Sequence, residues 1–224
     1  MLAAIREHLA ASAPFDAVHE EQRAHRDGEA RAARAAAVAR EAALAPLERF
    51  KQSLEAVGGR CAVVRDETEA AAVLARIIAE AKARRVAVSD SPLVRGVLAR
   101  VNSDAQFSEN VVAAELFDCD VGVTGAQWAV AETGTLVLES DVERHRLASL
   151  VPPVHVALVA AGGVRQTMAE VLQAINAQGR DRMSRTITFV TGPSRTSDIE
   201  LTLAIGVHGP GELHVVILEG AGAG

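Results

Sequence analysis

The segment that follows Val123 places a carboxylate among small and hydroxyl-bearing residues. It ends in Glu132, Thr133, Gly134 and Thr135. A glutamate on a glycine-containing turn can act as a general base or as a nucleophile, and threonine hydroxyls with nearby backbone N–H groups can cradle an anion. The same residues also fit a plain turn in which Gly134 takes a special backbone angle and Glu132 is solvated. The spacing matches neither a dinucleotide-binding nor an NTP-binding glycine loop.

A second segment, Thr191–Glu200, combines hydroxyls, backbone donors and one arginine. Its candidate anion-binding residues are Ser194, Arg195, Thr196, Ser197 and Asp198. Arginine holds a carboxylate or a phosphate through two parallel hydrogen bonds. Ser197 and Glu200 have the spacing of a capping box, which predicts a helix N-terminus that would attract an anion. A simple strand-to-helix turn is the alternative.

Histidines and further arginines supply the remaining candidates. His208 lies in a Gly- and Pro-rich loop, where it could move a proton or simply belong to a turn. Arg144 precedes the double proline and His155, and this group could hold a carboxylate or a phosphate at the entrance of a strand. Alternatively, the arginines are solvated and His155 is a core residue. His145 and His155 lack the spacing of a helical zinc-binding pair.

Short apolar runs that alternate with helical patterns must position these segments. Strands are predicted at Cys61–Val64, Val86–Val88, Asp120–Val123, Leu136–Leu138, Val154–Ala160, Ile187–Val190 and Leu213–Leu218, and helices at Glu67–Lys82, Leu93–Arg100 and Gln166–Gln178. The segment before Leu93 suits a helix N-terminus capped by Asp90 or Ser91. This alternation predicts an α/β sheet covered on both faces. Because ligands of such sheets bind beyond the carboxyl ends of strands, we expect the candidate residues to converge there.

The first third of the chain has a different composition. It is rich in Ala, Glu and Arg from Glu20 to Val57, and residues 30–43 carry few large apolar side chains. We expect Pro46 to break or open a helix there and Gly58 to end it. The sequence therefore predicts an Ala-rich helical arm over residues 1–57, able to pack on a second copy or a partner, and an α/β domain over residues 58–224.

Composition excludes several classes of function. A net charge of −6 and an aromatic content of 3% disfavour binding to nucleic acid. Cys61 and Cys119 fit no zinc or iron–sulfur pattern, so we expect no metal in this chain. With neither a signal peptide nor an apolar run of about 20 residues, the sequence indicates a cytoplasmic protein without a membrane span. Small molecules or other proteins are the expected ligands.

Four motifs of the chain together resemble the LUD-domain family. They are Ala131–Leu138, Pro152–His155, Thr191–Glu200 and Gly206–Pro210. The resemblance implies a three-layer α/β/α fold with a mixed, mostly parallel sheet, as in the NagB/RpiA/CoA-transferase group. The chain is similar to the short C-type members (LutC/YkgG type). This implies a part in the oxidation of L-lactate to pyruvate with LutA- and LutB-like partners, which would carry the iron–sulfur clusters.

Three hypotheses follow from the residues and the resemblance. The first is a subunit of a lactate-oxidising complex that binds a small carboxylate, with Arg195 as the counter-ion and Glu132 or His208 moving a proton. The second is a stand-alone isomerase or acyl-transfer enzyme for a small acidic or phosphorylated substrate, with Glu132 as its nucleophile or base. The third is a non-catalytic assembly or regulatory subunit that works through the Ala-rich arm.

Overall fold

The structure is a computed structural model that describes residues 45–109, 111–143, 146–179, 183–197, 203–206 and 209–220. One compact unit comprises Leu44–Gly224. Helix α3 (Pro46–Ala56) belongs to this unit, although the sequence assigns it to the arm. The reason is its apolar face, because Phe50 and Leu54 are fully buried against the α/β core. The rest of the expected arm, residues 1–44, lies outside the described residues.

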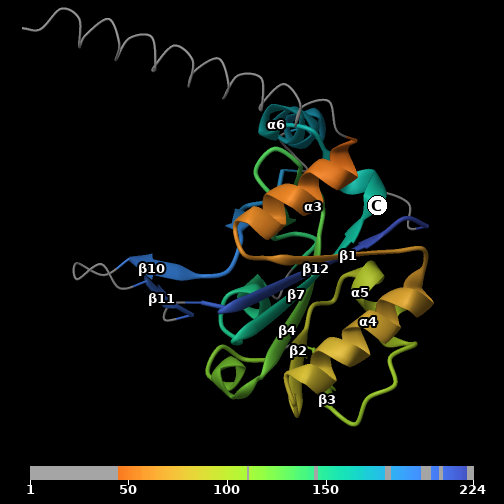
Figure 1. Cartoon of the computed structure of the whole chain (residues 1–224), viewed down its shortest axis with the longest axis vertical. Coiled ribbons are helices and arrows are strands. Elements are labelled where there is room, and N and C mark those ends of the chain that lie inside the picture. Colours follow the sequence, from red (N-terminus) through yellow and green to blue (C-terminus); the bar gives the residue numbers. More distant parts are fainter. Residues whose placement is uncertain are drawn as a thin grey trace, which may run out of the picture. The chain divides into compact units, whose positions relative to one another are not determined.

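Within the described ranges, the main sheet contains six parallel strands (Figure 1). Their spatial order is β1 (Arg60–Val64), β12 (Glu212–Leu218), β7 (Val154–Ala160), β4 (Val121–Ala126), β2 (Arg85–Val88) and β3 (Gln106–Ser108). The inner strands are nearly continuous apolar runs, as expected for parallel strands that are buried on both faces. The predicted α/β fold with a mostly parallel sheet is thus confirmed.

Two helices cover one face of the main sheet. Helix α4 (Glu67–Glu80) begins at Asp66, whose carboxylate accepts hydrogen bonds from the backbone N–H groups of Thr68 and Glu69. Helix α5 (Pro92–Leu98) begins at its proline, as predicted. The buried side chains of both helices pack on those of the sheet; they include Leu74, Ile78, Val94, Val97, Val123, Val156 and Leu158.

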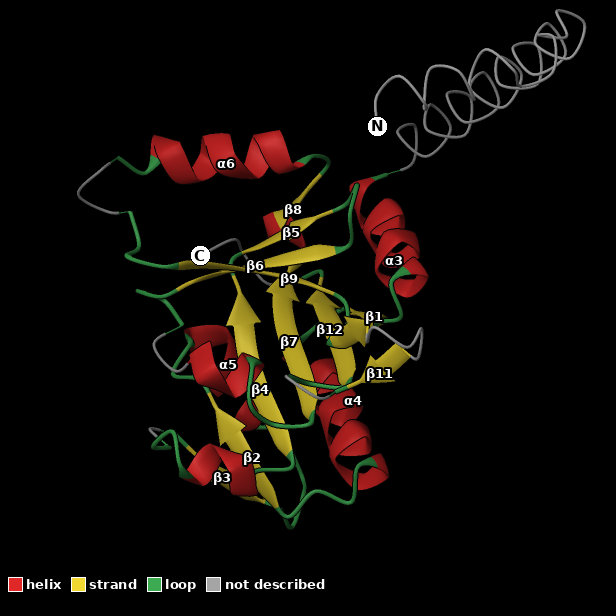
Figure 2. Ribbon diagram, turned by 90° about the vertical axis from the view of Figure 1, so that its left-hand side faces the viewer, coloured by secondary structure: helices red, strands yellow, loops and turns green. Residues whose placement is uncertain are grey.

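The other face is covered by α3 and by a second sheet (Figure 2). In the described part of the chain, the order of this second sheet is β8 (Val164–Arg165), β5 (Trp128–Val130), β6 (Thr135–Glu139) and β9 (Ile187–Thr191). Helix α6 (Met168–Ala177) packs on the outer side of the second sheet through Val171 and Ile175. Helices therefore lie on both sides of the sheets. The chain leaves the main sheet after β4 for β5 and β6, returns at β7, and leaves again for β8 and β9 before it returns at β12.

Short elements complete the connections. They are the 3-10 helices η1 (Glu115–Asp118), η2 (Arg146–Ser149) and η3 (Ala161–Gly163) and the antiparallel hairpin of β10 (Arg195–Ser197) and β11 (Leu203–Ile205). Ser197 lies in this hairpin opposite Leu203. The helix N-terminus predicted from the capping-box spacing of Ser197 and Glu200 falls on residues 198–202, which lie outside the described residues.

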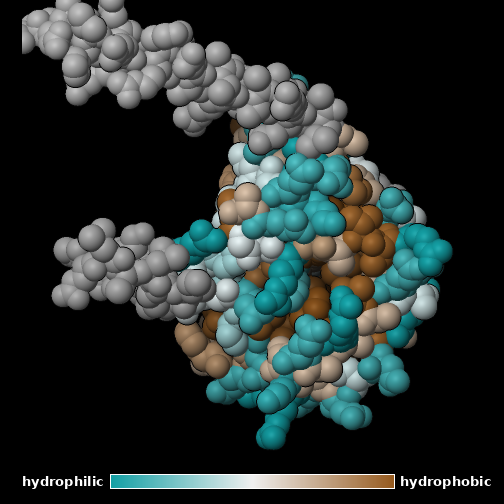
Figure 3. All heavy atoms as spheres, viewed as in Figure 1, coloured by the Kyte–Doolittle hydropathy of each residue, from teal (hydrophilic) through white to brown (hydrophobic). Residues whose placement is uncertain are grey.

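Strand β1 forms one edge of the main sheet, and β3 forms the other. Val63 of β1 is 38% exposed, and in the view of Figure 3 apolar surface near β1 is flanked by hydrophilic side chains. Among the helices that the structure describes, none is both long enough and apolar enough to cross a membrane.

Candidate functional site

A pocket of about 340 Å³ lies between the main sheet and the segment that follows β9. It is lined by Ser149, Leu150, His155, Phe189, Val190, Thr191, Gly192, Pro193, Ser194, Arg195, Gly209, Pro210 and Leu213. Three segments singled out in the sequence meet here: the turn after β9, the Gly/Pro loop before β12, and the strand that opens with the double proline. The pocket follows the carboxyl end of β9, as expected, but it lies at the amino ends of β7 and β12 in the main sheet.

Backbone hydrogen bonds hold these segments together. The N–H of Ser194 donates to the carbonyl of Pro210 at 2.8 Å, and the N–H of Gly206 donates to the carbonyl of Ser194 at 3.1 Å. The N–H of Gly211 donates to the carbonyl of Pro153 at 2.9 Å. The walls of the pocket are therefore fixed by main-chain contacts between loops that are remote in sequence.

Arg195 brings a positive charge to the pocket. It is exposed, and its Nη2 donates to the carbonyl of Val57 at 2.6 Å, just after helix α3 ends. A cation is favourable near the carboxyl end of a helix. Because a guanidinium has five N–H donors, a contact from Nη2 leaves donors with which it can bind an anion. Gly58 allows this approach, since a Cβ there would lie in contact with the guanidinium.

His155 lines the same pocket from the main sheet. Its side chain is almost completely buried, and its Nε2 lies 2.8 Å from Oγ1 of Thr124 on the neighbouring strand β4. No described residue is a hydrogen-bond partner of its Nδ1. Burial lowers the pKa of His155 from 6.5 to about 3, so its imidazole is neutral at physiological pH. The sequence left two interpretations of His155 open, a core residue or an anion ligand. In the structure, His155 is buried and also lines the pocket.

Three threonine hydroxyls connect the glutamate-bearing turn to the pocket segment. Oγ1 of Thr133 lies 2.7 Å from Oγ1 of Thr135, which lies 2.8 Å from Oγ1 of Thr191. The contact follows from the antiparallel pairing of β6 with β9, which sets Thr135 opposite Thr191. The predicted approach of these two segments is therefore present in the structure. Thr191 was not among the predicted site residues.

Gly134 takes the special backbone angle that the interpretation of this segment as a plain turn predicts. Its φ is +64°, in the left-handed region that favours glycine. The turn also packs directly on helix α3, because a Cβ on Gly134 would lie 2.6 Å from Cα of Leu54.

Glu132 has a different setting from the other candidates. Its carboxylate is exposed and accepts a hydrogen bond of 2.7 Å from the backbone N–H of Met168, the first residue of α6. A carboxylate at a helix N-terminus interacts favourably with the helix dipole. Glu132 is not among the residues that line the pocket. The structure therefore gives Glu132 the contact of a helix cap.

Several predicted site residues cannot be placed. Arg144, Asp198 and His208 lie outside the described residues. Thr196 and Ser197 belong to strand β10, and their side chains also lie outside the described part of the molecule. Of the predicted anion ligands, Ser194 and Arg195 line the pocket, while the turn of Thr133 to Thr135 reaches it through Thr191.

A second polar cluster lies at the carboxyl ends of β2 and β4 and was not predicted. Glu143 is fully buried there, beside Ser89, Ser91 and Gly125. Burial raises the pKa of the Glu143 carboxyl, and the surrounding donors, including the Gln127 side chain, only partly offset this effect. None of the described donors completes a well-aligned hydrogen bond to either carboxyl oxygen.

This cluster occupies a switch point of the main sheet. The chain leaves β2 toward β3 on one side, whereas it leaves β4 toward the second sheet and returns at β7 on the other side. Crevices of this type are common ligand sites in α/β folds. The signal in the sequence was the polar run Ser89–Ser91 directly after an apolar strand.

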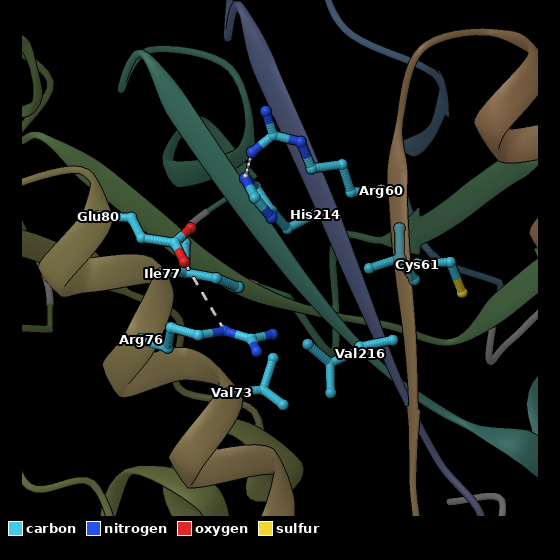
Figure 4. A pocket seen from close by; sticks show the side chains of 10 residues that line it. Arg60, Cys61, Val73, Arg76, Ile77, Glu80, His214 and Val216 are labelled. Atoms are coloured by element: carbon cyan, nitrogen blue, oxygen red, sulfur yellow. Dashed lines mark hydrogen bonds and ion pairs between the residues drawn. The ribbon is translucent and has the colours of Figure 1, made fainter.

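A further pocket of about 140 Å³ lies between α4 and the β1–β12 edge (Figure 4). Its His214 is nearly buried and lies 3.3 Å from the Glu212 carboxylate and 3.5 Å from the Arg60 guanidinium. Burial lowers the pKa of His214. These polar groups thus have partners within the protein, and none belongs to the motifs described above. Within the described ranges, no group of three or more His, Cys, Asp or Glu side chains is placed to hold a metal ion.

Comparison with known proteins places these features in a family context. Lactate utilization protein C of Deinococcus radiodurans is 40% identical over 106 residues, which are 47% of this chain and 49% of that protein. Lactate utilization protein C of Macrococcus caseolyticus is 33% identical over 118 residues, or 52% of this chain and 50% of that protein. YkgG of Escherichia coli is 35% identical over 117 residues, or 51% of this chain and 50% of YkgG. The chain thus spans about half the length of the curated relatives it matches.

A solved structure and a family profile extend the similarity over most of the chain. The crystal structure of a DUF162 family protein from Deinococcus radiodurans covers 77% of this chain and 96% of its own, with a TM-score of 0.59 and 24% identity, which supports the fold. The sequence model of the LUD domain matches residues 47–218, so it includes α3 and both sheets. The chain therefore belongs to the LUD domain family.

Proposed function

We propose that this protein is a component of a lactate-utilisation system and that it binds a small carboxylate in the pocket beside Arg195. The proposed role in lactate utilisation is supported by membership of the LUD domain family and by similarity to proteins named lactate utilization protein C. The pocket supports the location of the site, because residues from three of the four motifs that carry the family resemblance line it.

The chemistry of the pocket wall is the observation that carries the proposal. Arg195 supplies a cation, Ser194 a hydroxyl and His155 a neutral imidazole. Leu150, Phe189 and Leu213 supply apolar surface next to these groups. A carboxylate that is joined to a short carbon chain matches this combination of one charged donor and an apolar wall. The volume of about 340 Å³ lies within the range of small-molecule sites.

Partner proteins complete the proposed system. We propose that LutA- and LutB-like proteins carry the iron–sulfur clusters and accept the electrons, while this chain binds the organic acid. Cys61 and Cys119 are separate and unpaired, and burial raises the pKa of both thiols. Neither is therefore activated as a thiolate.

The geometry does not favour a stand-alone acyl-transfer enzyme based on Glu132. Its carboxylate accepts a hydrogen bond from the N-terminus of α6, and Glu132 is absent from the pocket lining. A nucleophile would have to approach the bound substrate.

Binding of L-lactate and pyruvate to the purified chain tests the proposal. Calorimetric titration should give saturable 1:1 binding, and Arg195→Ala should weaken it more than tenfold, because a charge-assisted pair is lost. Arg76→Ala is the matched control, since Arg76 is an exposed arginine on α4 that does not line this pocket. Equal affinity for wild type and Arg195→Ala would remove Arg195 from the site, and absence of binding to wild type would refute the proposal.

A further inference from the structure

Strand β1 is an edge of the main sheet that lacks the usual protection against pairing with another chain. Its residues Cys61–Val64 carry no charge, no proline and no bulge, and Val63 is 38% exposed. Edge strands that stay unpaired usually have such features, because their free N–H and C=O groups can otherwise join a second sheet. The opposite edge, β3, is a strand of only three residues, two of them polar. Of the two described edges, β1 is therefore the one suited to pairing.

The pairing with β12 shows which backbone groups of β1 face outward. The carbonyl of Val64 accepts a hydrogen bond of 2.9 Å from the N–H of Glu219, directly after β12, so the backbone groups of Val64 point toward β12. Successive residues of a strand direct their N–H and C=O groups to opposite sides. Those of Ala62 therefore also point toward β12, whereas those of Cys61 and Val63 point away from the sheet.

Hydrogen bonds at both ends of β1 limit this open stretch. The N–H of Gly59 donates to a carbonyl of α3 at 2.9 Å, and the N–H of Arg65 donates to a carboxylate of α4 at 2.9 Å. The carbonyl of Arg65 also accepts a hydrogen bond. For the N–H and C=O groups of Cys61 and Val63, the described residues provide no partner. The open edge thus consists of four backbone groups on two residues.

We propose that β1 pairs antiparallel with β1 of a second copy of this chain about a two-fold axis at Ala62. In this register Cys61 lies opposite Val63 of the second copy, and Val63 lies opposite its Cys61. The four open groups of each chain are then all used, in four hydrogen bonds between the copies. A register shifted in either direction would need backbone groups of Gly59 or Arg65, which are already bonded. The two six-stranded sheets become one continuous sheet.

A second copy is the occupant that the pattern of open groups fits. Cys61 and Val63 are placed symmetrically about Ala62, so two identical antiparallel strands satisfy each other completely. The contact is closed by its own two-fold symmetry and leaves no open edge at β1. Ala62 faces its own copy at the axis, where the Cα atoms of a pair without mutual hydrogen bonds lie about 4.5 Å apart. Its small side chain allows this close approach.

Helices α3 and α4 extend the contact on the two faces of the strand (Figure 1). Cys61 belongs to one apolar cluster with Phe50 and Leu54 of α3, and Val64 belongs to another with Leu74 of α4. Helix α4 contacts both β1 and β12. Because neighbouring strands lie about 4.8 Å apart, an axis beside β1 brings α4 to about 10 Å from its copy. This is the ordinary distance between packed helices, so the paired strands lie between helices of both copies.

Removal of one outward N–H tests the pairing in the full chain. Val63→Pro leaves the sheet of a single chain intact, because an edge strand tolerates proline where its N–H faces solvent. It deletes two of the four hydrogen bonds between the copies. Sedimentation equilibrium should give a dimer for wild type and for the matched control Val63→Thr, which keeps the N–H, whereas Val63→Pro should raise the dissociation constant at least tenfold. A wild type that is monomeric at every concentration overturns the inference, and so does unchanged affinity in folded Val63→Pro.

Cross-linking tests the register and decides the question if Val63→Pro does not fold. In a Cys61→Ala background, Ala62→Cys places two thiols across the axis, with Cα atoms about 4.5 Å apart and thus within the range of a disulfide. The matched variant Val63→Cys in the same background places its two Cα atoms about 8–9 Å apart, beyond that range. Under mild oxidation Ala62→Cys alone should form a covalent dimer. Equal yields from the two variants, or no dimer from Ala62→Cys, overturn the inference and assign any association to another surface.

Discussion

The burial of His155 makes a quantitative prediction about stability in acid. The folded protein keeps this imidazole neutral down to a pH of about 3, whereas the unfolded chain protonates it below about pH 6.5. The stabilising contribution is therefore fully present above pH 6.5 and is lost as the pH falls from there toward 3. Each pH unit in this window costs about 1.4 kcal/mol.

The size of the effect follows from the width of that window. Between pH 6.5 and pH 5 the loss is about 2 kcal/mol, and over the whole window it approaches about 5 kcal/mol. Domains are typically stable by about 5–15 kcal/mol, so the loss at pH 5 is a measurable fraction of the total. His155→Gln removes the titration and keeps a side chain that can contact Thr124.

Urea unfolding of wild type and His155→Gln at pH 7.5 and pH 5.0 measures this contribution. The free energy of unfolding of wild type should fall by about 2 kcal/mol more than that of the variant between the two pH values. Other titrating groups contribute equally to both proteins, so their effects cancel in the difference. Parallel pH dependences would show that His155 is already protonated, or solvated, in the folded state, and would refute the reasoning.

Two further substitutions test other parts of the fold. Glu143→Gln should raise the free energy of unfolding at pH 8 and leave it little changed at pH 4. Because the pKa of Glu143 is raised in the folded protein, wild type loses stability as the pH rises above the ordinary value near 4.5. Urea unfolding at both pH values checks this prediction, and a variant that is less stable than wild type at pH 8 would contradict it. Gly134→Ala should cost about 1–3 kcal/mol for the left-handed backbone alone, plus the displacement of Leu54; an unchanged melting temperature would show that the turn adapts freely.

The strands that the sequence predicts correctly are those whose burial is continuous. β7 and β12 are apolar along most of their length, since both faces of the main sheet are covered. β5 and β8 were missed, because three and two residues are too few to show a pattern. β10 was not predicted either, because its pairing with β11 is not visible in the local sequence.

The candidate site shows the same division between local and tertiary information. The convergence of the turn before β6 with the segment after β9 could be anticipated, because both flank strands. The contact of the Glu132 carboxylate with the N-terminus of α6 could not be anticipated, because its partner Met168 lies 36 residues further along the chain. Strand alternation assigns His155 to one face of β7, but only the packed loops show that a pocket lies against that face.

The position of β12 in the main sheet has a consequence for the order in which the protein forms during synthesis. β12 lies between β7 and β1, and its His214 is the register partner of Arg60 in β1. Both neighbours of β12 are therefore synthesised before it. Until residues 212–218 leave the ribosome, β1 has no strand beside it among those described. The pocket also waits for this strand, because Leu213 forms part of its wall. A ligand of the pocket can therefore stabilise the finished fold but cannot assist the nascent chain before that final strand is in place.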